Sequence, residues 1–165
     1  MIDFFDGEYG FLSNFYAHQV FGFRTVEHFY QAAKATNRYD VKKIMLAETP
    51  REAKKIGRRI ELREDWDAVK ISVMQLALEE KFSGNLRTSL IFTLPHKLVE
   101  GNTWHDNFWG DCRCGKCSNI SGANILGKLL ESVREKLYEN ELVKARMLPL
   151  VFPEIVCLEN ALKHE

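Results

Sequence analysis

The sequence predicts a compact, mainly helical α+β fold in which a few short strands lie near the start. Two observations support this fold class. Apolar residues recur with a helical period in several segments after residue 25, whereas the first thirty residues are rich in aromatic side chains separated by glycines. No internal repeat or linker-like tract divides the chain of 165 residues, so we expect a single domain over residues 1–165.

The first thirty residues are expected to form short strands joined by turns, because aromatic residues favour strands and glycines favour turns. The aromatic side chains of this segment are Phe4, Phe5, Tyr9, Phe11, Phe15, Tyr16, Phe21 and Phe23. From Thr25, the expected N-cap, the apolar pattern takes a helical period and predicts a helix that runs to about Thr36.

Two helices are predicted between residues 49 and 82. The capping box Thr49-Pro50-Arg51-Glu52, with proline at the first helical position, predicts a short helix that ends near Gly57 and exposes a basic face. A longer helix, capped at Asp65 or a neighbour, should run through Phe82. Its wide apolar stripe belongs in the core.

The second half of the chain is expected to contain two more helices and one strand. A helix capped by its first residue is predicted over residues 85–92, and Lys97–Glu100 is expected to form a short strand. From Asn124 a strong apolar pattern predicts a helix that reaches Met147. The tail over residues 148–165 is left unassigned.

The charge balance excludes a bulk electrostatic affinity for nucleic acids or anionic membranes, because Lys plus Arg and Asp plus Glu number 23 each. Any contact with nucleic acid must therefore be local. No apolar run approaches the roughly 20 residues that span a bilayer, and the first residues lack the pattern of a signal peptide. We expect a cytoplasmic protein with no membrane partner.

A first candidate site lies on the helix that begins after Thr25. Glu27, Gln31 and Lys34 are spaced at i, i+4 and i+7, which places them along one line of the helix beside the aromatic stripe. A carboxylate and an amine could therefore flank one ligand. The alternative is that these residues are the solvated face of an amphipathic helix, and periodicity alone favours that alternative. His28 is expected to be an ordinary hydrogen-bonding histidine.

A second candidate site is the segment Trp104–Asp111, which holds two tryptophans, a histidine and two carboxylates. An exposed indole in a loop offers a flat face on which a base can stack. The alternative is that the tryptophans fill the core while the aspartates cap turns. The helix entry at Gly122-Ala123-Asn124 also resembles an anion-binding helix N-terminus.

Three cysteines lie within six residues, at Cys112, Cys114 and Cys117. They are close enough along the chain to share a zinc ion with Cys157, His105 or another ligand. Zinc sites usually show two separated pairs of ligands, and a second Cys-x-x-Cys is missing here. We therefore favour reduced structural cysteines over a metal site, and a metal site over a redox site.

Several motifs in order carry a resemblance to a known family. Phe11-Leu12-Ser13-Asn14-Phe15-Tyr16, Val26-Glu27-His28-Phe29-Tyr30-Gln31 and Lys34-Ala35 resemble the opening of YbiA/NADAR proteins. Asp106-Asn107-Phe108-Trp109-Gly110-Asp111 and Gly122-Ala123-Asn124-Ile125-Leu126-Gly127, followed by Arg134, resemble the closing motifs of that family. With Trp66, the resemblance covers about residues 3–137. Where members linked to riboflavin synthesis carry glycines, this chain has its three cysteines, so the substrate pocket is where we expect a difference.

The resemblance implies N-glycosidase activity on an N-ribosyl compound. Known substrates in the family are a phosphoribosylamino-pyrimidine intermediate of riboflavin synthesis and ADP-ribose attached to guanine, so ADP-ribosylated DNA is a possible partner. In the resemblance, Lys34 matches a lysine of the family that is proposed to form a Schiff base. The expected catalytic residues are Glu27, Lys34 and Asp106, and the expected substrate-binding residues are Asn14, Gln31, Trp66, Trp109, Gly110, Asp111, Asn124 and Arg134.

Cleavage of a ribosyl C–N bond builds positive charge on the anomeric carbon, which a carboxylate such as Glu27 or Asp106 would stabilise. Arg24, Arg58 or Arg134 could bind a phosphate. This chemistry requires neither a metal nor a cofactor. The alternative function is a non-catalytic module that binds ADP-ribose or a nucleotide, and a zinc-dependent adaptor comes third. The catalytic hypothesis requires the Glu27–Lys34 segment and the loop around Trp109 to share one cavity.

Overall fold

The protein is described by a computed structural model, which covers residues 1–117 and 119–151. Within these residues helices dominate, and the sheet has two strands, which confirms the mainly helical α+β fold. The elements in order are the 3-10 helix η1 (Gly7–Leu12), α1 (Val26–Ala32), α2 (Arg38–Met45), α3 (Pro50–Gly57), α4 (Trp66–Lys81), α5 (Arg87–Ile91), β1 (Gly101–Asn102), β2 (Asp111–Cys112) and α6 (Ile125–Val151).

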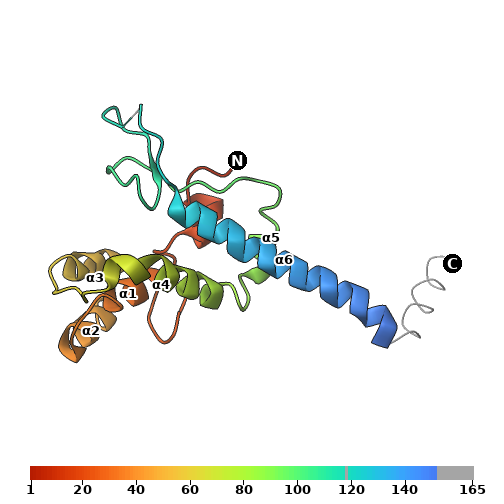
Figure 1. Ribbon diagram of the computed structural model, residues 1–165, viewed down its shortest axis with the longest axis horizontal. Coiled ribbons are helices and arrows are strands. Elements are labelled where there is room, and N and C mark those ends of the chain that lie inside the picture. The colour runs from red at the N-terminus through yellow and green to blue at the C-terminus, as the bar shows by residue number, and fades with distance from the viewer. Residues whose placement is uncertain (118, 152–165) are drawn as a thin grey trace.

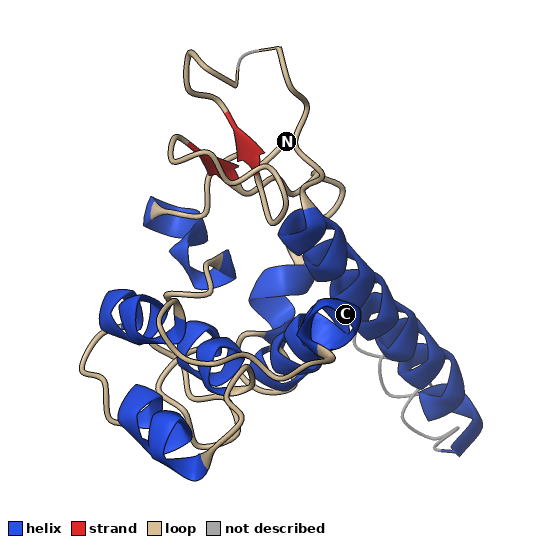
Figure 2. Cartoon of the chain, turned by 60° about the vertical axis from the view of Figure 1, so that its left-hand side comes forward, coloured by secondary structure: helices blue, strands red, loops and turns tan. Residues whose placement is uncertain are grey.

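The helices form two connected groups. Helix α1 packs against α2, α3 and α4, while the long helix α6 packs against α4 and α5. Figure 1 shows the first four helices gathered beside α6, and the loops that carry both strands lie beyond the start of α6. Strands β1 and β2 pair in parallel, with Gly101 opposite Asp111. Figure 2 shows these strands within the loop-rich end of the molecule.

One hydrophobic core joins the two groups of helices. Fully buried side chains from the opening segment and from α4, α5 and α6 meet in it, among them Leu12, Leu78, Leu90 and Leu130. Packing of this kind supplies most of the stability of short helices, because helices of this length are marginal alone. Among the described helices, none has an apolar stretch that would allow it to cross a membrane.

The helix starts that depend on a side-chain cap are confirmed at two positions. The Thr25 hydroxyl accepts a hydrogen bond from the His28 N–H, and the Thr49 side chain accepts from the Glu52 N–H. In a capping box, the Glu52 carboxylate would accept a hydrogen bond from the N–H of the N-cap residue Thr49. Here it accepts from the N–H of the preceding residue, Glu48. Helix α3 ends at Gly57, as predicted.

The prediction of strands in the first thirty residues is wrong. The segment contains η1 and turns, with single bridges such as Ile2 to Leu98. Its aromatic side chains pack onto helices instead of lining strands, and the Phe11 ring meets the Phe82 ring edge-on with centroids 6.4 Å apart. Within the strand expected at residues 97–100, the structure shows a single bridge at Leu98. Strand β1 begins at Gly101, directly after the expected strand.

Other boundaries also differ. Helix α1 ends at Ala32, four residues before the predicted end, so Lys34 lies in the turn that follows. The side chain of Asp65 does not cap α4, because it pairs with Arg63 at 2.5 Å. Helix α5 begins at residue 87 without a side-chain cap.

Two further differences are the unpredicted helix α2, capped by Asn37, and the extension of α6 to Val151. Of the unassigned tail, residues 152–165 lie outside the described residues, as does Cys157.

Candidate active site

A cavity of about 430 Å³ lies where α1, α3 and the loops around β1 meet. Its size is typical of a site for a small ligand. The predicted residues that line it are Asn14, Glu27, Gln31, Lys34, Asp106 and Trp109. The two sequence segments on which the catalytic hypothesis depends therefore open onto one cavity. The three residues expected to be catalytic all belong to its wall.

Three side chains from the region of α1 form a hydrogen-bonded chain along this wall. The Gln31 amide nitrogen donates to Glu27 Oε1 across 2.7 Å, and Lys34 Nζ donates to Gln31 Oε1 across 2.6 Å. Helical spacing brings such residues onto one line. Glu27 and Gln31 are buried, so the alternative of a solvated polar face does not hold for them. Gln31 links a carboxylate to an amine.

Burial shifts the proton affinity at both ends of this chain. It raises the pKa of Glu27 above its ordinary value, against the opposing effects of Lys54, the Gln31 hydrogen bond, Lys34 and Arg58. It lowers the pKa of Lys34, although the Glu27 carboxylate opposes that shift. A carboxyl that holds its proton more readily and an amine that loses it more readily are suited to proton transfer and nucleophilic attack near neutral pH.

Aromatic rings form the apolar part of the wall, with Tyr30 at their centre. The Tyr30 ring meets Trp66 with centroids 5.0 Å apart and Trp109 with centroids 5.4 Å apart, both edge-on. The Lys34 ammonium lies 5.1 Å from the centre of the Tyr30 ring. Trp66 is buried behind Tyr30 and is not part of the lining, so it supports the wall from the second layer. Tyr30 itself also lines the cavity, which the sequence does not predict.

Asp106 is held in place by the loop over residues 103–110, which joins β1 to β2. Its Oδ1 accepts hydrogen bonds from the N–H groups of Phe108 and Trp109. The buried Asn102 donates through Nδ2 to the Asp106 carbonyl, and its Oδ1 accepts from the Asp106 N–H. Asp106 therefore caps a turn and also lines the cavity. The turn-capping interpretation is confirmed, and a catalytic role for Asp106 stays a prediction.

Glu100 is a lining residue that the sequence analysis missed as a site residue. It precedes β1, and its N–H donates to the Asn124 side chain. Burial raises the pKa of Glu100 to about 7, and the nearby charge of Asp106 adds to this effect. Among the described residues, Glu100 Oε2 and Asn14 Oδ1 are buried without a hydrogen-bond partner. Such acceptors in a cavity wall are suited to a polar ligand.

The cavity also has a basic side and an exposed aromatic group. Lys54 of α3 and Arg58, which follows the end of that helix, both line it. Arg58 is one of the three arginines predicted to bind a phosphate. Trp104 lines it as well and keeps 59% of its surface exposed. Lysine and arginine together are suited to phosphate, and an exposed indole is suited to stacking on a base. Neither Lys54 nor Trp104 was among the predicted site residues.

Besides Trp66, four predicted substrate-binding residues lie outside the lining, and their hydrogen bonds hold neighbouring loops together. Gly110 accepts a hydrogen bond from the Asn124 N–H through its carbonyl, and the Asn124 amide donates to the Leu98 carbonyl. Asp111 accepts from the Gly122 N–H. Arg134 is buried and donates to the Thr93 hydroxyl and the His96 carbonyl. Their contacts position the wall, and direct substrate binding by them stays a prediction.

Two minor expectations are settled by hydrogen bonding. His28 is fully buried between the Thr25 hydroxyl and the Ala47 carbonyl, so it is a structural histidine. At the entry of α6, the N–H of Gly122 is taken by Asp111 and that of Ala123 by the Asn107 carbonyl. These groups are therefore not free to bind an anion. The three cysteines cluster with His105, which also lines the cavity.

Comparisons with known proteins identify the family to which the chain is similar. The family model described as the NADAR domain matches residues 4–138. The chain is 42% identical over 140 residues to N-glycosidase Npun_R5314 from Nostoc punctiforme, covering 78% of this chain and 86% of the relative. It is 40% identical over 138 residues to N-glycosidase YbiA from Escherichia coli, covering 79% and 82% respectively.

A solved structure shares the fold. The NMR structure of the E. coli protein YbiA superposes with a TM-score of 0.72 at 36% identity, covering 86% of this chain and 89% of that one. The chain is also 37% identical over 152 residues to the chloroplastic riboflavin biosynthesis protein PYRR of Zea mays, covering 78% of this chain but 23% of that longer protein. On the evidence of sequence and fold, the chain belongs to the NADAR domain family.

Proposed function

We propose that this protein is an N-glycosidase that hydrolyses the C–N bond between a ribose and an amine-bearing base. The observation that carries the proposal is the shared cavity, in which the buried chain from Glu27 to Lys34 faces the loop of Asp106 and Trp109. The names of the bacterial relatives, which are N-glycosidases, support the same reaction class.

In the proposed reaction, the bond between the anomeric carbon and nitrogen breaks and its electron pair goes to the nitrogen. The Asp106 carboxylate stabilises the positive charge that develops on the sugar, and Glu27 orients the water and takes its proton. The water oxygen adds to the anomeric carbon. We assign the proton that the leaving amine needs to Glu100, because it lines the cavity and its pKa of about 7 keeps it partly protonated at neutral pH.

The proposed substrate is a small phosphorylated ribosyl compound. Lys54 and Arg58 would hold the phosphate, while Trp109 and the exposed Trp104 would hold the base. A phosphoribosylamino-pyrimidine of riboflavin synthesis is the leading candidate, because PYRR, a riboflavin biosynthesis protein, is among the relatives. The second candidate is ADP-ribose attached to guanine, which would make ADP-ribosylated DNA a partner. We expect the reaction in the cytoplasm, where cysteine thiols stay reduced.

A second mechanism uses Lys34 as the nucleophile. Ring opening of the N-riboside leaves the base joined to the anomeric carbon as an imine. The Lys34 amine would add to that carbon, and the base would leave as its protonated amine while the carbon becomes a Schiff base with Lys34. Water would then hydrolyse the Schiff base and free the lysine, with Glu27 carrying protons through Gln31. Burial lowers the pKa of Lys34, which favours the neutral amine that this step needs. Borohydride added during turnover should then leave a sugar adduct on Lys34, detectable by peptide mass. Turnover without an adduct would favour attack by water.

The direct test is turnover. The protein is incubated with the ribosylamino-pyrimidine phosphate and, separately, with DNA that carries ADP-ribosylated guanine. The products are followed as released base, free ribose phosphate or restored guanine. Product release that depends on the enzyme supports the proposal. Tight binding of either compound without any product would instead support the alternative of a non-catalytic nucleotide-binding module.

A further inference from the structure

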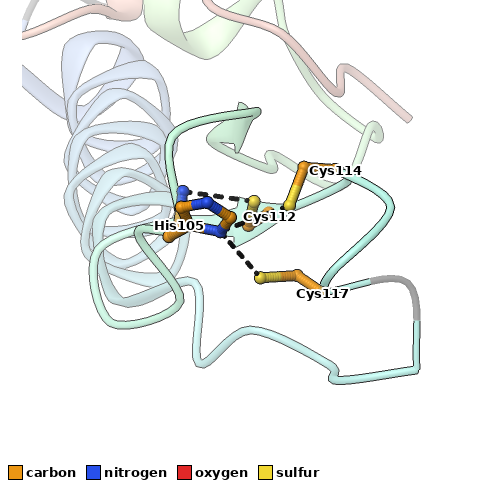
Figure 3. Close-up of side chains that lie close together, drawn as sticks. All are labelled: His105, Cys112, Cys114 and Cys117. Carbon is orange, nitrogen blue, oxygen red and sulfur yellow. Dashed lines mark hydrogen bonds between the residues drawn. The ribbon is translucent and has the colours of Figure 1, made fainter.

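The segment between β1 and α6 brings together four side chains of types that bind metals. None of the four takes part in the proposed reaction. His105, Cys112, Cys114 and Cys117 each offer one ligand atom, and these four atoms lie within 4.8 Å of one another. Figure 3 shows the His105 ring facing the three sulfur atoms. The ring nitrogen Nδ1 lies 3.3 Å from Cys114 Sγ and 3.4 Å from Cys117 Sγ.

These distances are those of a tetrahedral zinc site. With Zn–S bonds of about 2.3 Å and Zn–N bonds of about 2.0 Å, neighbouring nitrogen and sulfur ligands are about 3.5 Å apart. Three thiolates and one imidazole are also a common ligand set for structural zinc, and this set disfavours magnesium and calcium, which prefer oxygen ligands. We propose that His105, Cys112, Cys114 and Cys117 bind one zinc ion as a closed Cys3His site.

The backbone around the cluster is arranged for this purpose. The Cys117 N–H donates to the Cys114 carbonyl, which closes a tight turn and brings the two thiols to the same side. The His105 N–H points at Cys112 Sγ across 3.3 Å, and such N–H donors stabilise metal-bound thiolates. His105 itself adopts a φ of 68°, in the left-handed region that non-glycine residues rarely occupy. A disulfide would use two of the three thiols and would leave His105 without a role.

The zinc is structural and not catalytic, because four protein ligands leave no position for water or substrate. Its place in the fold explains what it stabilises. His105 belongs to the 103–110 loop, Cys112 to β2, and Cys114 and Cys117 to the segment that follows. The ion therefore ties together three stretches of chain that have little regular structure. Trp104 and Asp106, which flank His105, both line the cavity, so the zinc fixes the loop that faces the substrate.

Metal binding also sets the protonation of His105. When Nδ1 binds the ion, the proton must be on Nε2, and the ring becomes a fixed hydrogen-bond donor. His105 is part of the cavity wall. This proposal replaces the sequence-based preference for three reduced structural cysteines. The missing second Cys-x-x-Cys is no obstacle, because His105 supplies the fourth ligand from the preceding loop.

The test measures metal in the full chain, purified under reducing conditions after removal of any affinity tag. Elemental analysis should find about one zinc per chain. Cys114→Ser is the decisive variant, because Cys114 is the least buried of the three thiols and its loss disturbs packing least. It should retain less than roughly a tenth of the zinc. The matched control, Cys157→Ser, should keep the full amount, since Cys157 is not among the four ligands.

A second measurement keeps the proposal testable if Cys114→Ser folds poorly. Cobalt(II) added to metal-free wild-type protein should give the visible bands of a tetrahedral site and a near-ultraviolet thiolate-to-cobalt band. In His105→Cys, which supplies a fourth thiolate, that band should grow by about one third while zinc binding is kept. A wild-type protein that neither contains zinc nor takes up one equivalent overturns the proposal. So does full zinc content in Cys114→Ser, or stoichiometric iron in place of zinc.

Discussion

Gly57 in α3 lies against the Gln31 side chain with no space between them for a methyl group. A Cβ on Gly57 would lie 2.0 Å from Gln31 Oε1 and 2.9 Å from Gln31 Cβ. Gly57→Ala should therefore push the Gln31 side chain away and break the hydrogen bonds that link Glu27 to Lys34. We expect kcat/KM to fall about tenfold and stability to fall by about 1–3 kcal/mol. Enzyme kinetics and thermal unfolding measure the two effects.

The matched control is Gly84→Ala, because no atom lies within 4 Å of a Cβ at that position. It should leave both kcat/KM and the melting temperature close to those of the wild type. If Gly57→Ala folds and retains full activity, Gln31 is not needed as the link between the carboxylate and the amine.

Glu27→Gln should keep the fold and lower kcat by about a hundredfold to ten-thousandfold, because the amide cannot take a proton from water. It should also change how stability depends on pH. Since burial raises the pKa of Glu27 above 4.5, the folded protein loses stability as the pH rises from that value through the pKa of the folded state. Glu27→Gln should lack this loss. Thermal unfolding across pH measures it, and the exposed Glu64→Gln is the control.

The helical part of the site was predictable because its signals are local. Thr25 as a cap and the spacing of Glu27 and Gln31 depend only on helix geometry. Lys34 lies in the turn just after α1, and its hydrogen bond to Gln31 keeps the three side chains in one line. Helix α2 has a similar local signal in its sequence. Its N-cap Asn37 accepts a hydrogen bond from the Asp40 N–H.

The rest of the site depends on contacts between distant segments, which periodicity does not record. Glu100 lines the cavity because β1 and the 103–110 loop turn it toward α1, and its sequence neighbours give no sign of this. The aromatic residues of the opening segment favour strands by composition, whereas their packing partners, such as Phe82, come from the end of a helix far along the chain. The spacing of the cysteines likewise does not reveal that His105 completes their set.

Glu100 should produce an alkaline limb in the activity profile. A proton donor works only while it is protonated, so kcat/KM should fall above its pKa of about 7, approaching tenfold per pH unit. Glu100→Gln should lower the activity at neutral pH and remove this limb. The measurement is kcat/KM from about pH 5 to about pH 9. An unchanged limb in Glu100→Gln would assign the proton to another group, whereas Glu64→Gln should behave as the wild type.

Trp104 and Trp109 should respond differently to substitution, because they share the cavity but differ in packing. Trp109 packs against Tyr30 and Phe108, so Trp109→Ala should weaken substrate binding and turnover. It should also lower stability by about 3 kcal/mol, the low end for a tryptophan because Trp109 is only half-buried. Trp104 is 59% exposed, so Trp104→Ala should raise KM by about five- to a hundredfold, the value of one stacked base, with no change in the melting temperature. Trp104→Phe, which keeps a flat ring, should recover most of the affinity. A KM that stays at the wild-type value in Trp104→Ala would show that the exposed indole lies beside the site and does not hold the base.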